Sequence, residues 1–261
     1  MSTILDGIVA HHRQLAANDA RDLGALMEKA AALPPPRPFR NALAHQEGVS
    51  VVAEVKRRSP SKGPLAPELD PAQLAVAYQS GGAACLSVLT DEEFFGGTAD
   101  DLFRARQACG LPVLRKDFTV SALDVCDARL MGADAALLIV AALEDQELGS
   151  FLQTARELAM AALVEVHDER ELEAALGAGA DLVGVNQRDL RTFEVEVGRA
   201  ERLAERLPPG VVAVAESGIA APEDVRVLGE AGYHAVLVGE SLVTAEDPAG
   251  AVRRLREASR A

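Results

Sequence analysis

The chain has 261 residues, a length that suits one α/β barrel of about 250 residues or two smaller domains. Hydrophobic residues make up 49% of the chain but aromatic residues only 3%, so Ala, Val and Leu must form most of the core. Lys and Arg total 26 against 40 Asp and Glu, a net charge of −14 that argues against nucleic acid or an anionic membrane as partner.

The three cysteines, Cys85, Cys109 and Cys126, are too few for a disulfide framework, and those at 85 and 126 predict small buried hydrophobic residues. The first twenty residues lack the continuous apolar run of a signal peptide. No apolar run approaches the roughly 18 residues that a membrane-spanning helix requires. We therefore expect a cytoplasmic protein with no membrane partner.

The N-terminal part of the chain predicts a helix over residues 3–32, which the proline-rich run 34–38 ends because proline cannot continue a helix. We interpret residues 1–48 as an N-terminal helical extension and residues 49–261 as a catalytic barrel, together forming a single domain. His11 and His12 lie on the predicted helix, where we expect solvated side chains and no metal site.

From residue 49 onward, short apolar runs alternate with amphipathic stretches. The eight runs are nearly all apolar, as expected for parallel strands covered on both faces. They cover residues 49–55, 84–89, 112–115, 135–140, 162–166, 182–186, 211–216 and 235–239. The stretches between them predict helices near residues 71–80, 99–108, 120–131, 144–159, 168–177, 197–206, 222–231 and 248–259.

A small repeat supports this alternation of strands and helices. Gly82, Gly132, Gly179 and Gly232 each stand shortly before an apolar run, as expected for left-handed caps that end the preceding helices. Eight such units without a change in composition predict an α/β fold, a (β/α)8 TIM barrel with the helical extension before it. A doubly wound open sheet is the alternative.

Five of the predicted strands end in charged or amide side chains, at the face where barrels of this kind carry their active sites. Side chains at positions i and i+2 share one face of a strand, so Glu54 can face the same centre as Lys56. A single charge after a strand usually begins a solvated loop, but the repeated pattern favours an acid–base site. The strand-end residues are Glu54, Lys56, Lys116, Glu165, His167, Asn186, Arg188, Glu216 and Ser217.

His167 fits either a supporting partner of Glu165 or an ordinary loop residue. The mixed-charge run from Arg199 to Arg206 predicts one solvated helix face.

Small and polar residues follow the last two strands, where barrels often bind phosphate. Gly218 follows the seventh strand, and Gly239, Glu240 and Ser241 follow the eighth. The basic loop 57–63 after the first strand favours an anionic substrate in this acidic chain, although an exposed loop is the alternative. Apolar residues also occur in the predicted loops at this face, where Phe94, Phe95 and Phe118 indicate either loop packing or a pocket for an aromatic ring.

Taken in chain order, these motifs resemble the indole-3-glycerol phosphate synthase family. The resemblance extends from about Pro38 to the end of the eighth unit, and the segment 37–43 also resembles the extension of that family. The motifs are EVKRRSPSKG at 54–63, SVLTD at 87–91, LRKDF at 114–118, LLI at 137–139, VEV at 164–166, GVNQRDL at 184–190, AESGI at 215–219 and VGESL at 238–242.

The resemblance implies a carboxy-lyase of tryptophan biosynthesis. Its substrate would be 1-(2-carboxyphenylamino)-1-deoxyribulose 5-phosphate, and its products indole-3-glycerol phosphate, CO2 and water. The electron-rich ring carbon attacks the ketone, CO2 leaves as the ring regains aromaticity, and dehydration completes the indole. The ring supplies its own electrons, so the resemblance implies no cofactor and no metal.

The resemblance also assigns roles to the strand-end residues. Lys116 would be the general acid at the ketone oxygen, and Glu165 the general base or the acid–base partner in dehydration. Lys56 would stabilise negative charge or donate a second proton, and Glu54 would hold both lysines. Asn186 and Arg188 would bind the sugar hydroxyls and the carboxylate region, and Glu216 and Ser217 would line the site.

Two further groups follow from the resemblance. Phe95, Phe118 and Leu137 would enclose the aromatic ring. The phosphate would be held by Ser59, Gly218, Gly239, Glu240 and Ser241, partly through backbone groups, with the Glu240 carboxylate turned away from it.

Other functions fit the same barrel. Lys116 suits the nucleophile of a Schiff-base aldolase or a sugar-phosphate isomerase, and a non-catalytic phosphate-binding regulator is a third class. The complete acid–base set and the ring pocket favour the synthase. We expect a monomer, with a weak homodimer as the alternative.

Overall fold

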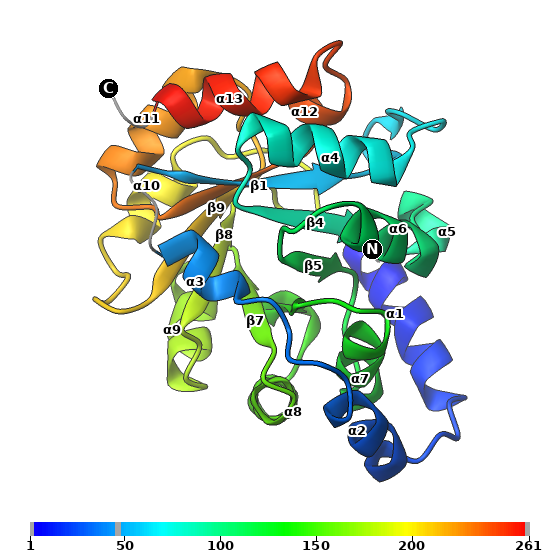
Figure 1. Cartoon of the computed structure of the whole chain (residues 1–261). Helices are drawn as coiled ribbons and strands as arrows, with labels where there is room; N and C mark the ends of the chain where they lie inside the picture. The colour runs from blue at the N-terminus through cyan, green and yellow to red at the C-terminus, as the bar shows by residue number, and fades with distance from the viewer. Residues whose placement is uncertain (1–2, 45–47, 259–261) are drawn as a thin grey trace.

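The computed structural model describes residues 3–44 and 48–258. Eight parallel strands close into a barrel in chain order (Figure 1), which confirms the predicted TIM barrel and excludes an open sheet. Each strand ends within one residue of its predicted run. The strands are β1 (Ser50–Val55), β4 (Cys85–Leu89), β5 (Val113–Lys116), β6 (Ala135–Ile139), β7 (Ala161–Val166), β8 (Leu182–Asn186), β9 (Val212–Glu216) and β10 (Ala235–Val238).

Helices follow the strands and cover the outside of the barrel (Figure 1). None of the helices within the described ranges is long and apolar enough to cross a membrane. The main helices are α4 (Pro71–Gly81), α6 (Ala99–Ala108), α7 (Ala122–Leu130), α8 (Asp145–Glu157), α9 (Glu169–Gly177), α10 (Arg199–Ala204), α11 (Pro222–Glu230) and α13 (Pro248–Ala258). Ser259, the last residue of the final predicted helix, lies outside the described residues.

Short elements in the loops complete the barrel face that carries the predicted site. These are the two-stranded sheet of β2 (Arg58–Ser59) and β3 (Gly63–Pro64), α5 (Glu92–Phe95), the 3-10 helix η1 (Val140–Ala142) and α12 (Glu240–Val243). The four repeat glycines, Gly82, Gly132, Gly179 and Gly232, have φ angles of 92°, 95°, 85° and 100°. This conformation confirms the predicted left-handed caps, because a side chain there would be strained.

Successive side chains of each strand point to opposite faces of the sheet, so every strand contributes side chains to two apolar layers. The inner layer fills the barrel and includes Val52, Leu114, Leu163 and Leu237, while the outer layer lies between strands and helices. All three cysteines are buried and unpaired, as predicted for 85 and 126. The filled interior leaves the carboxyl ends of the strands as the place where polar side chains can gather.

The predicted helix over residues 3–32 is two helices, α1 (Ile4–Ala17) and α2 (Leu23–Ala31), so that prediction is wrong at residues 18–22. The break contains Asn18, Asp19 and Asp22, whose short polar side chains compete with helical backbone hydrogen bonds. The Asp22 carboxylate accepts a hydrogen bond from the Ala25 N–H and caps α2. Arg21 in the break forms ion pairs with Asp19 and with Asp127 of α7.

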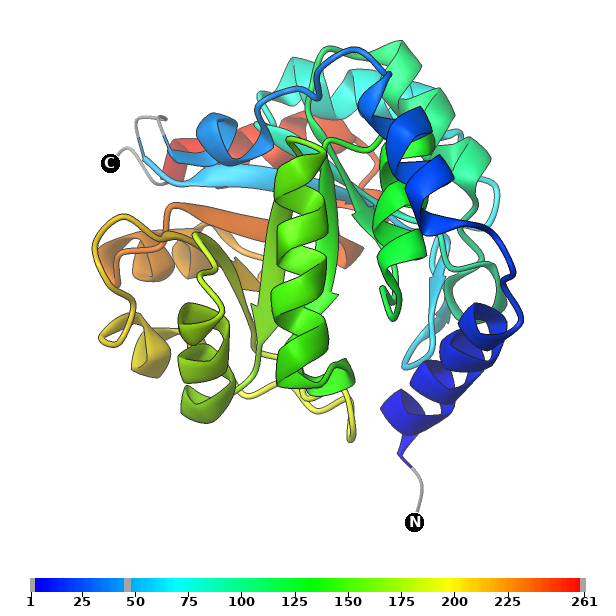
Figure 2. The same ribbon diagram turned by 90° about the horizontal axis from the view of Figure 1, so that it is seen from below.

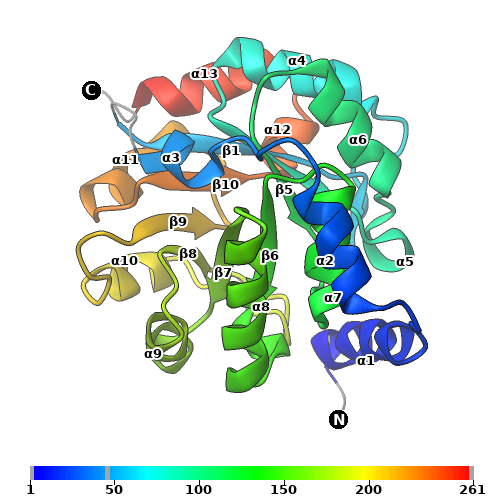
Figure 3. The same cartoon turned by 60° about the horizontal axis from the view of Figure 1, so that its bottom comes forward.

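The extension reaches both ends of the barrel. At the carboxyl ends of the strands, Leu5 and Ile8 of α1 join the inner apolar cluster. At the opposite end, the Ser50 hydroxyl donates to the Leu43 carbonyl of α3 (Phe39–Ala44). Figures 2 and 3 show α1 and α3 on opposite sides of the molecule, with α2 between them.

One buried carboxylate ties the extension to the barrel. Asp134, just before β6, is fully buried and accepts hydrogen bonds from the backbone N–H groups of Arg37 and Val113 at 2.7 and 2.9 Å. It also pairs with Arg106 at 2.9 Å. The corresponding residue of another repeat, Asp181, pairs with Arg40 but its side chain is 67% exposed.

We predict that Asp134→Ala lowers the free energy of unfolding by about 3 kcal/mol, because it leaves two backbone N–H donors and the Arg106 charge without their buried partner. Asp181→Ala, the matched control, should cost less than about 1 kcal/mol because its ion pair is solvated. Urea unfolding followed by circular dichroism measures both. Equal losses in the two variants would contradict this account of the contact.

Candidate active site

A cavity of about 490 Å³ opens at the carboxyl ends of the strands. All sixteen residues predicted from the sequence as site residues line it, from loops and strand ends on every side of the barrel. They are Glu54, Lys56, Ser59, Phe95, Lys116, Phe118, Leu137, Glu165, Asn186, Arg188, Glu216, Ser217, Gly218, Gly239, Glu240 and Ser241. The closed barrel therefore brings together side chains that are up to 187 positions apart in the chain, from Glu54 to Ser241.

The centre of the cavity is an ion cluster contributed by three strands. The Lys116 ammonium lies 3.0 Å from one oxygen of Glu165 and 3.7 Å from one oxygen of Glu216. The Glu165 side chain is fully buried and that of Glu216 is 2% exposed. Because buried charges must be paired, each group in this cluster depends on the others for its charge state.

The cluster shifts the pKa values of its members in different directions. Burial alone would lower the pKa of Lys116, but the charges of Glu165, Glu216 and Glu54 raise it above its usual value. Burial would raise the pKa of Glu165, but Lys116, His167 and Asn186 lower it. Burial and the neighbouring Glu165 charge raise the pKa of Glu216 to about 8. At neutral pH the cluster therefore holds a charged lysine, an ionised Glu165 and a protonated Glu216.

A second ion pair lies on β1. The Lys56 ammonium is 2.5 Å from Glu54 Oε1, as expected for side chains two positions apart. The Ser87 hydroxyl donates to the other Glu54 oxygen at 3.4 Å. Glu54 was expected to hold Lys116 as well, but Lys116 pairs with Glu165 and Glu216, and Glu54 acts on it only through its charge.

Two glycines make room for these carboxylates. A Cβ atom at Gly184 in β8 would lie 2.1 Å from Glu216 Oε1, and one at Gly239 would lie 2.4 Å from Glu54 Oε1. Gly239 was predicted as a site residue, but Gly184 was not. A glycine in the middle of an apolar strand is the sequence signal for such a close approach.

Amide and guanidinium groups surround Glu165 and the adjoining loop. The Asn186 amide donates to Glu165 Oε1 at 2.9 Å, and its oxygen accepts from the Arg188 N–H at 3.0 Å. The Arg188 guanidinium donates to the Phe193 carbonyl at 2.9 Å. Leu190, Phe193 and Val195 of this loop also line the cavity, and none of them was predicted as a site residue.

Arg199 also departs from its prediction. It is buried and donates to the Asn186 carbonyl, so the expected solvated face is wrong at this position.

The apolar side of the cavity contains Phe95 and Phe118, whose ring centroids are 6.2 Å apart. Asp91 caps α5 and so places Phe95, because its carboxylate accepts from the N–H groups of Phe94 and Phe95. His12 of α1 lies 2.8 Å from Asp91 and its side chain is 16% exposed, so the expected solvated side chain is wrong for His12. The extension thus contacts the loops that form the ring pocket.

His12, Asp91 and Asp117 each place one potential metal ligand within 4.8 Å of the others. Protein donors already occupy the carboxylates: Asp91 accepts from two backbone N–H groups, and Asp117 pairs with Arg115 at 2.8 Å. The arrangement is explained by these contacts without an ion, and the prediction of no metal stays a prediction.

The opposite side of the cavity is formed by the turns after β9 and β10. Ser217 and Gly218 have φ angles of 65° and 73°, and the first of these is strained for a residue with a side chain. The Ser241 hydroxyl donates to the Ile219 carbonyl at 3.5 Å, which joins the two turns. The Glu240 carboxylate pairs with Lys62 of the β1–α4 loop at 2.8 Å, and Lys62 is a lining residue that was not predicted individually.

Known proteins resemble this chain over nearly its whole length. The profile of the family described as "Indole-3-glycerol phosphate synthase" matches residues 5–255. The chain is 52% identical to indole-3-glycerol phosphate synthase 2 of Streptomyces coelicolor, over 98% of this chain and 99% of that protein. It is 51% identical to the indole-3-glycerol phosphate synthase of a Nocardioides species, over 97% of this chain and 98% of that protein.

A solved structure supports the fold alone. The thiamine phosphate pyrophosphorylase of Pyrococcus furiosus superposes with a TM-score of 0.61 at 18% identity, over 84% of this chain and 96% of that one. Such a low identity supports no shared activity. The near-complete match to the family profile and the high identity to curated relatives are the stronger findings. This chain belongs to the indole-3-glycerol phosphate synthase family.

Proposed function

We propose that the chain converts 1-(2-carboxyphenylamino)-1-deoxyribulose 5-phosphate into indole-3-glycerol phosphate, CO2 and water. This is the carboxy-lyase reaction of the family in tryptophan biosynthesis (EC 4.1.1.48). The observation that carries the proposal is the buried Lys116–Glu165–Glu216 cluster, which faces a cavity with aromatic side chains on one side and small polar turns on the other. A substrate with an anilino ring, a ketone and a phosphate matches these three surfaces.

Lys116 is proposed as the proton donor. The surrounding carboxylates keep its ammonium charged, so the group is protonated when the ring carbon attacks the ketone. The ketone oxygen becomes more basic as negative charge develops on it, and the ammonium neutralises that charge by donating a proton. Phe95, Phe118 and Leu137 hold the ring against the ketone, so that the two reacting carbons are already adjacent and oriented for bond formation.

Glu165 is proposed as the base of the dehydration. Its carboxylate is ionised beside Lys116, and Asn186 fixes its orientation through Oε1. It removes the proton from the carbon that becomes part of the indole double bond, while hydroxide leaves with a proton from Lys116. Lys56, held by Glu54, supplies positive charge near the departing hydroxide, and Asn186 and Arg188 bind the sugar hydroxyls and the carboxylate region.

The phosphate is proposed to lie against Ser59, Gly218, Gly239, Glu240 and Ser241, partly through backbone groups. The salt bridge to Lys62 neutralises the Glu240 carboxylate, which would otherwise repel the phosphate. Residues 1–48 act as an extension that supports the site, and residues 49–261 form the catalytic barrel. We further propose a cytoplasmic monomer that needs no cofactor, metal or nucleic acid, with a weak homodimer as the alternative.

The direct test is to add the substrate to purified protein in the presence of a metal chelator and follow indole fluorescence. The chain has no Trp, so the background from the protein is low. A saturable rise supports the proposal. If no indole forms, and borohydride instead traps an imine between Lys116 and a phosphorylated sugar, the proposal is wrong and the aldolase class replaces it.

We predict that Lys116→Ala lowers kcat by about 100-fold to 10,000-fold, the usual range for a general acid. KM should change little, because the phosphate and ring contacts are made by other residues. Steady-state kinetics measures both constants. A variant with wild-type kcat would remove Lys116 from the mechanism.

We predict that Ser241→Asp raises KM at least about 10-fold with a small effect on kcat, because a carboxylate at this turn repels the substrate phosphate. Ser80→Asp is the matched control, since Ser80 is exposed on α4 and does not line the cavity. Both KM values come from the fluorescence assay. An unchanged KM in Ser241→Asp would contradict the phosphate site.

We predict that kcat/KM falls as the pH rises above about 8, where Glu216 loses its proton. The additional negative charge repels the anionic substrate, whereas below that pH the side chain is neutral. Glu216→Gln keeps a neutral side chain and should lose this decline. A pH profile of the two proteins decides the matter, and an identical decline in the variant would assign it to another group.

A further inference from the structure

His167 is a buried imidazole that the proposed mechanism does not use. It follows β7 directly and lies two residues after Glu165. Its Nδ1 atom is 2.9 Å from Glu171 Oε2, an oxygen that also accepts from the His167 backbone N–H. Its Nε2 atom is buried, forms no hydrogen bond with any described residue, and lies 3.5 Å from Glu165 Oε1. The imidazole thus bridges two carboxylates.

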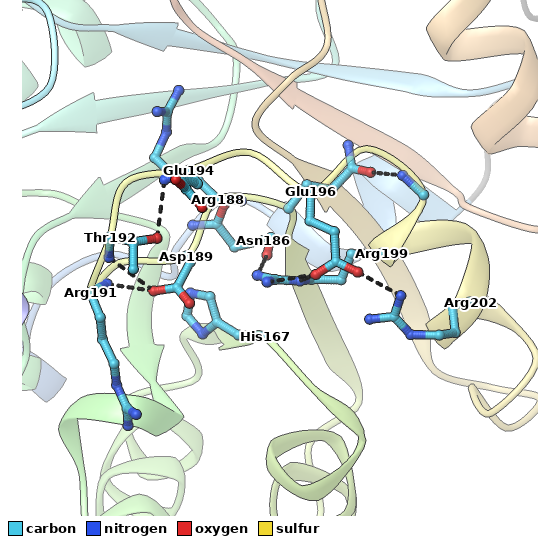
Figure 4. Close-up of polar contacts among 12 residues, drawn as sticks. His167, Asn186, Arg188, Asp189, Arg191, Thr192, Glu194, Glu196, Arg199 and Arg202 are labelled. Carbon is cyan, nitrogen blue, oxygen red and sulfur yellow. Dashed lines mark hydrogen bonds and ion pairs between the residues drawn. The ribbon is translucent and has the colours of Figure 1, made fainter.

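The same imidazole separates Glu165 from a second cavity. This cavity, of about 180 Å³, lies beneath the loop after β8 and is lined by His167, Glu171 and Asp189 but not by Glu165. Figure 4 shows the imidazole pointing toward the loop that carries Asp189 and Arg191. Side-chain exposure rises outward, from 0% for Glu165 to 11% for His167 and 16% for Glu171. Water in the second cavity can therefore reach the imidazole without entering the substrate cavity.

Charged groups surround the imidazole on every side. Burial alone would lower the pKa of His167, but the hydrogen bond to Glu171 and the Glu165 charge raise it, while Arg199 opposes them. The charged residues of the surrounding elements are Glu165 on β7, Asp168 and Glu171 at the start of α9, Asp189, Arg191 and Glu196 in the loop after β8, and Arg199 and Arg202 on α10.

The proposed reaction consumes one proton per turnover. The substrate carboxylate leaves as neutral CO2 and the ketone oxygen leaves as water, so one added proton balances the charge. Lys116 gives one proton to the ketone oxygen and another to the departing hydroxide, whereas Glu165 recovers only one from carbon. The 3.0 Å contact between Glu165 and Lys116 returns that proton directly. Lys116 therefore needs one further proton per turnover, and solvent is its ultimate source.

We propose that His167 is a proton relay: it takes a proton from water in the second cavity and passes it through Glu165 to the Lys116 amine. The imidazolium Nε2–H transfers its proton to the Glu165 carboxylate, and the carboxylic acid, once rotated, transfers it to the neutral Lys116 amine. A half-turn of the ring about Cβ–Cγ then turns the deprotonated Nε2 atom away from Glu165 and toward the second cavity, where it takes a proton from water. The reverse half-turn returns the Nε2–H to Glu165. One solvent proton enters per cycle, and no group is left changed. The relay rests on the proposed function.

The relay depends on the position of His167 between Glu165 and the second cavity. His167 acts through Glu165 and does not touch the substrate cavity, so it is a positioning and proton-supplying residue. A merely structural role would make activity depend on folding alone. A relay makes kcat depend on an external proton carrier once the imidazole is removed.

The test is His167→Asn, whose amide keeps a hydrogen-bond donor for Glu171 but does not titrate. In dilute buffer kcat should fall about 10-fold or more with KM unchanged, a smaller loss than for a direct general acid. Added imidazole should restore kcat in a saturable manner, because the second cavity reaches the vacated space. The same imidazole should not restore Lys116→Ala. His234→Asn, a histidine variant at the opposite barrel end, should keep wild-type kcat and show no response.

If His167→Asn does not fold, Glu171→Gln replaces it. That variant keeps a partner oxygen for the ring but removes the charge that favours the imidazolium, so its kcat should fall at a lower pH than in the wild type. A wild-type kcat in the folded variant, or a loss that imidazole does not restore, overturns the relay. If the wild-type protein itself forms no indole, the proposed function fails and the relay fails with it.

Discussion

The compensation of buried charge around Lys116 is the constraint on which the rest of the site depends. A lysine and two glutamates at this depth would each be costly alone, and only their mutual contacts make the burial tolerable. Each group comes from a different strand, so the cluster exists only when the barrel closes in this register. The register places Asn186 beside Glu216, and Gly184 leaves the space that the Glu216 carboxylate occupies. Fold and chemistry are therefore set by the same backbone.

The extension is part of the same arrangement. Helix α1 contacts the face that carries the cluster, where His12 pairs with the aspartate that caps α5 and so places Phe95. Helix α3 lies at the other end, and Asp134 joins the linker before it to β5 and β6. The helices before the first strand thus hold both ends of the barrel, and the ring pocket depends on contacts that begin at the N-terminus.

Much of the fold was predictable because fully buried parallel strands are continuous apolar runs, and the helix-ending glycines mark where such runs begin. The predicted site residues meet in one cavity because strand ends converge at one barrel face. The helix predicted over 3–32 is wrong because Asn18, Asp19 and Asp22 favour a break between two helices over a continuous one. Contacts between distant parts of the chain, such as that of His12 with Asp91, depend on the closed barrel and leave little local signal.

The proposed chemistry depends on where the protons of the buried cluster lie before substrate binds, and neutron diffraction from crystals grown at neutral pH locates them directly. The account predicts three hydrogens on the Lys116 nitrogen, none on the Glu165 carboxylate and one on Glu216. A hydrogen on Glu165 with Glu216 ionised, or a neutral Lys116 amine, would contradict it, because the cluster would then lack its charged donor or its ready base.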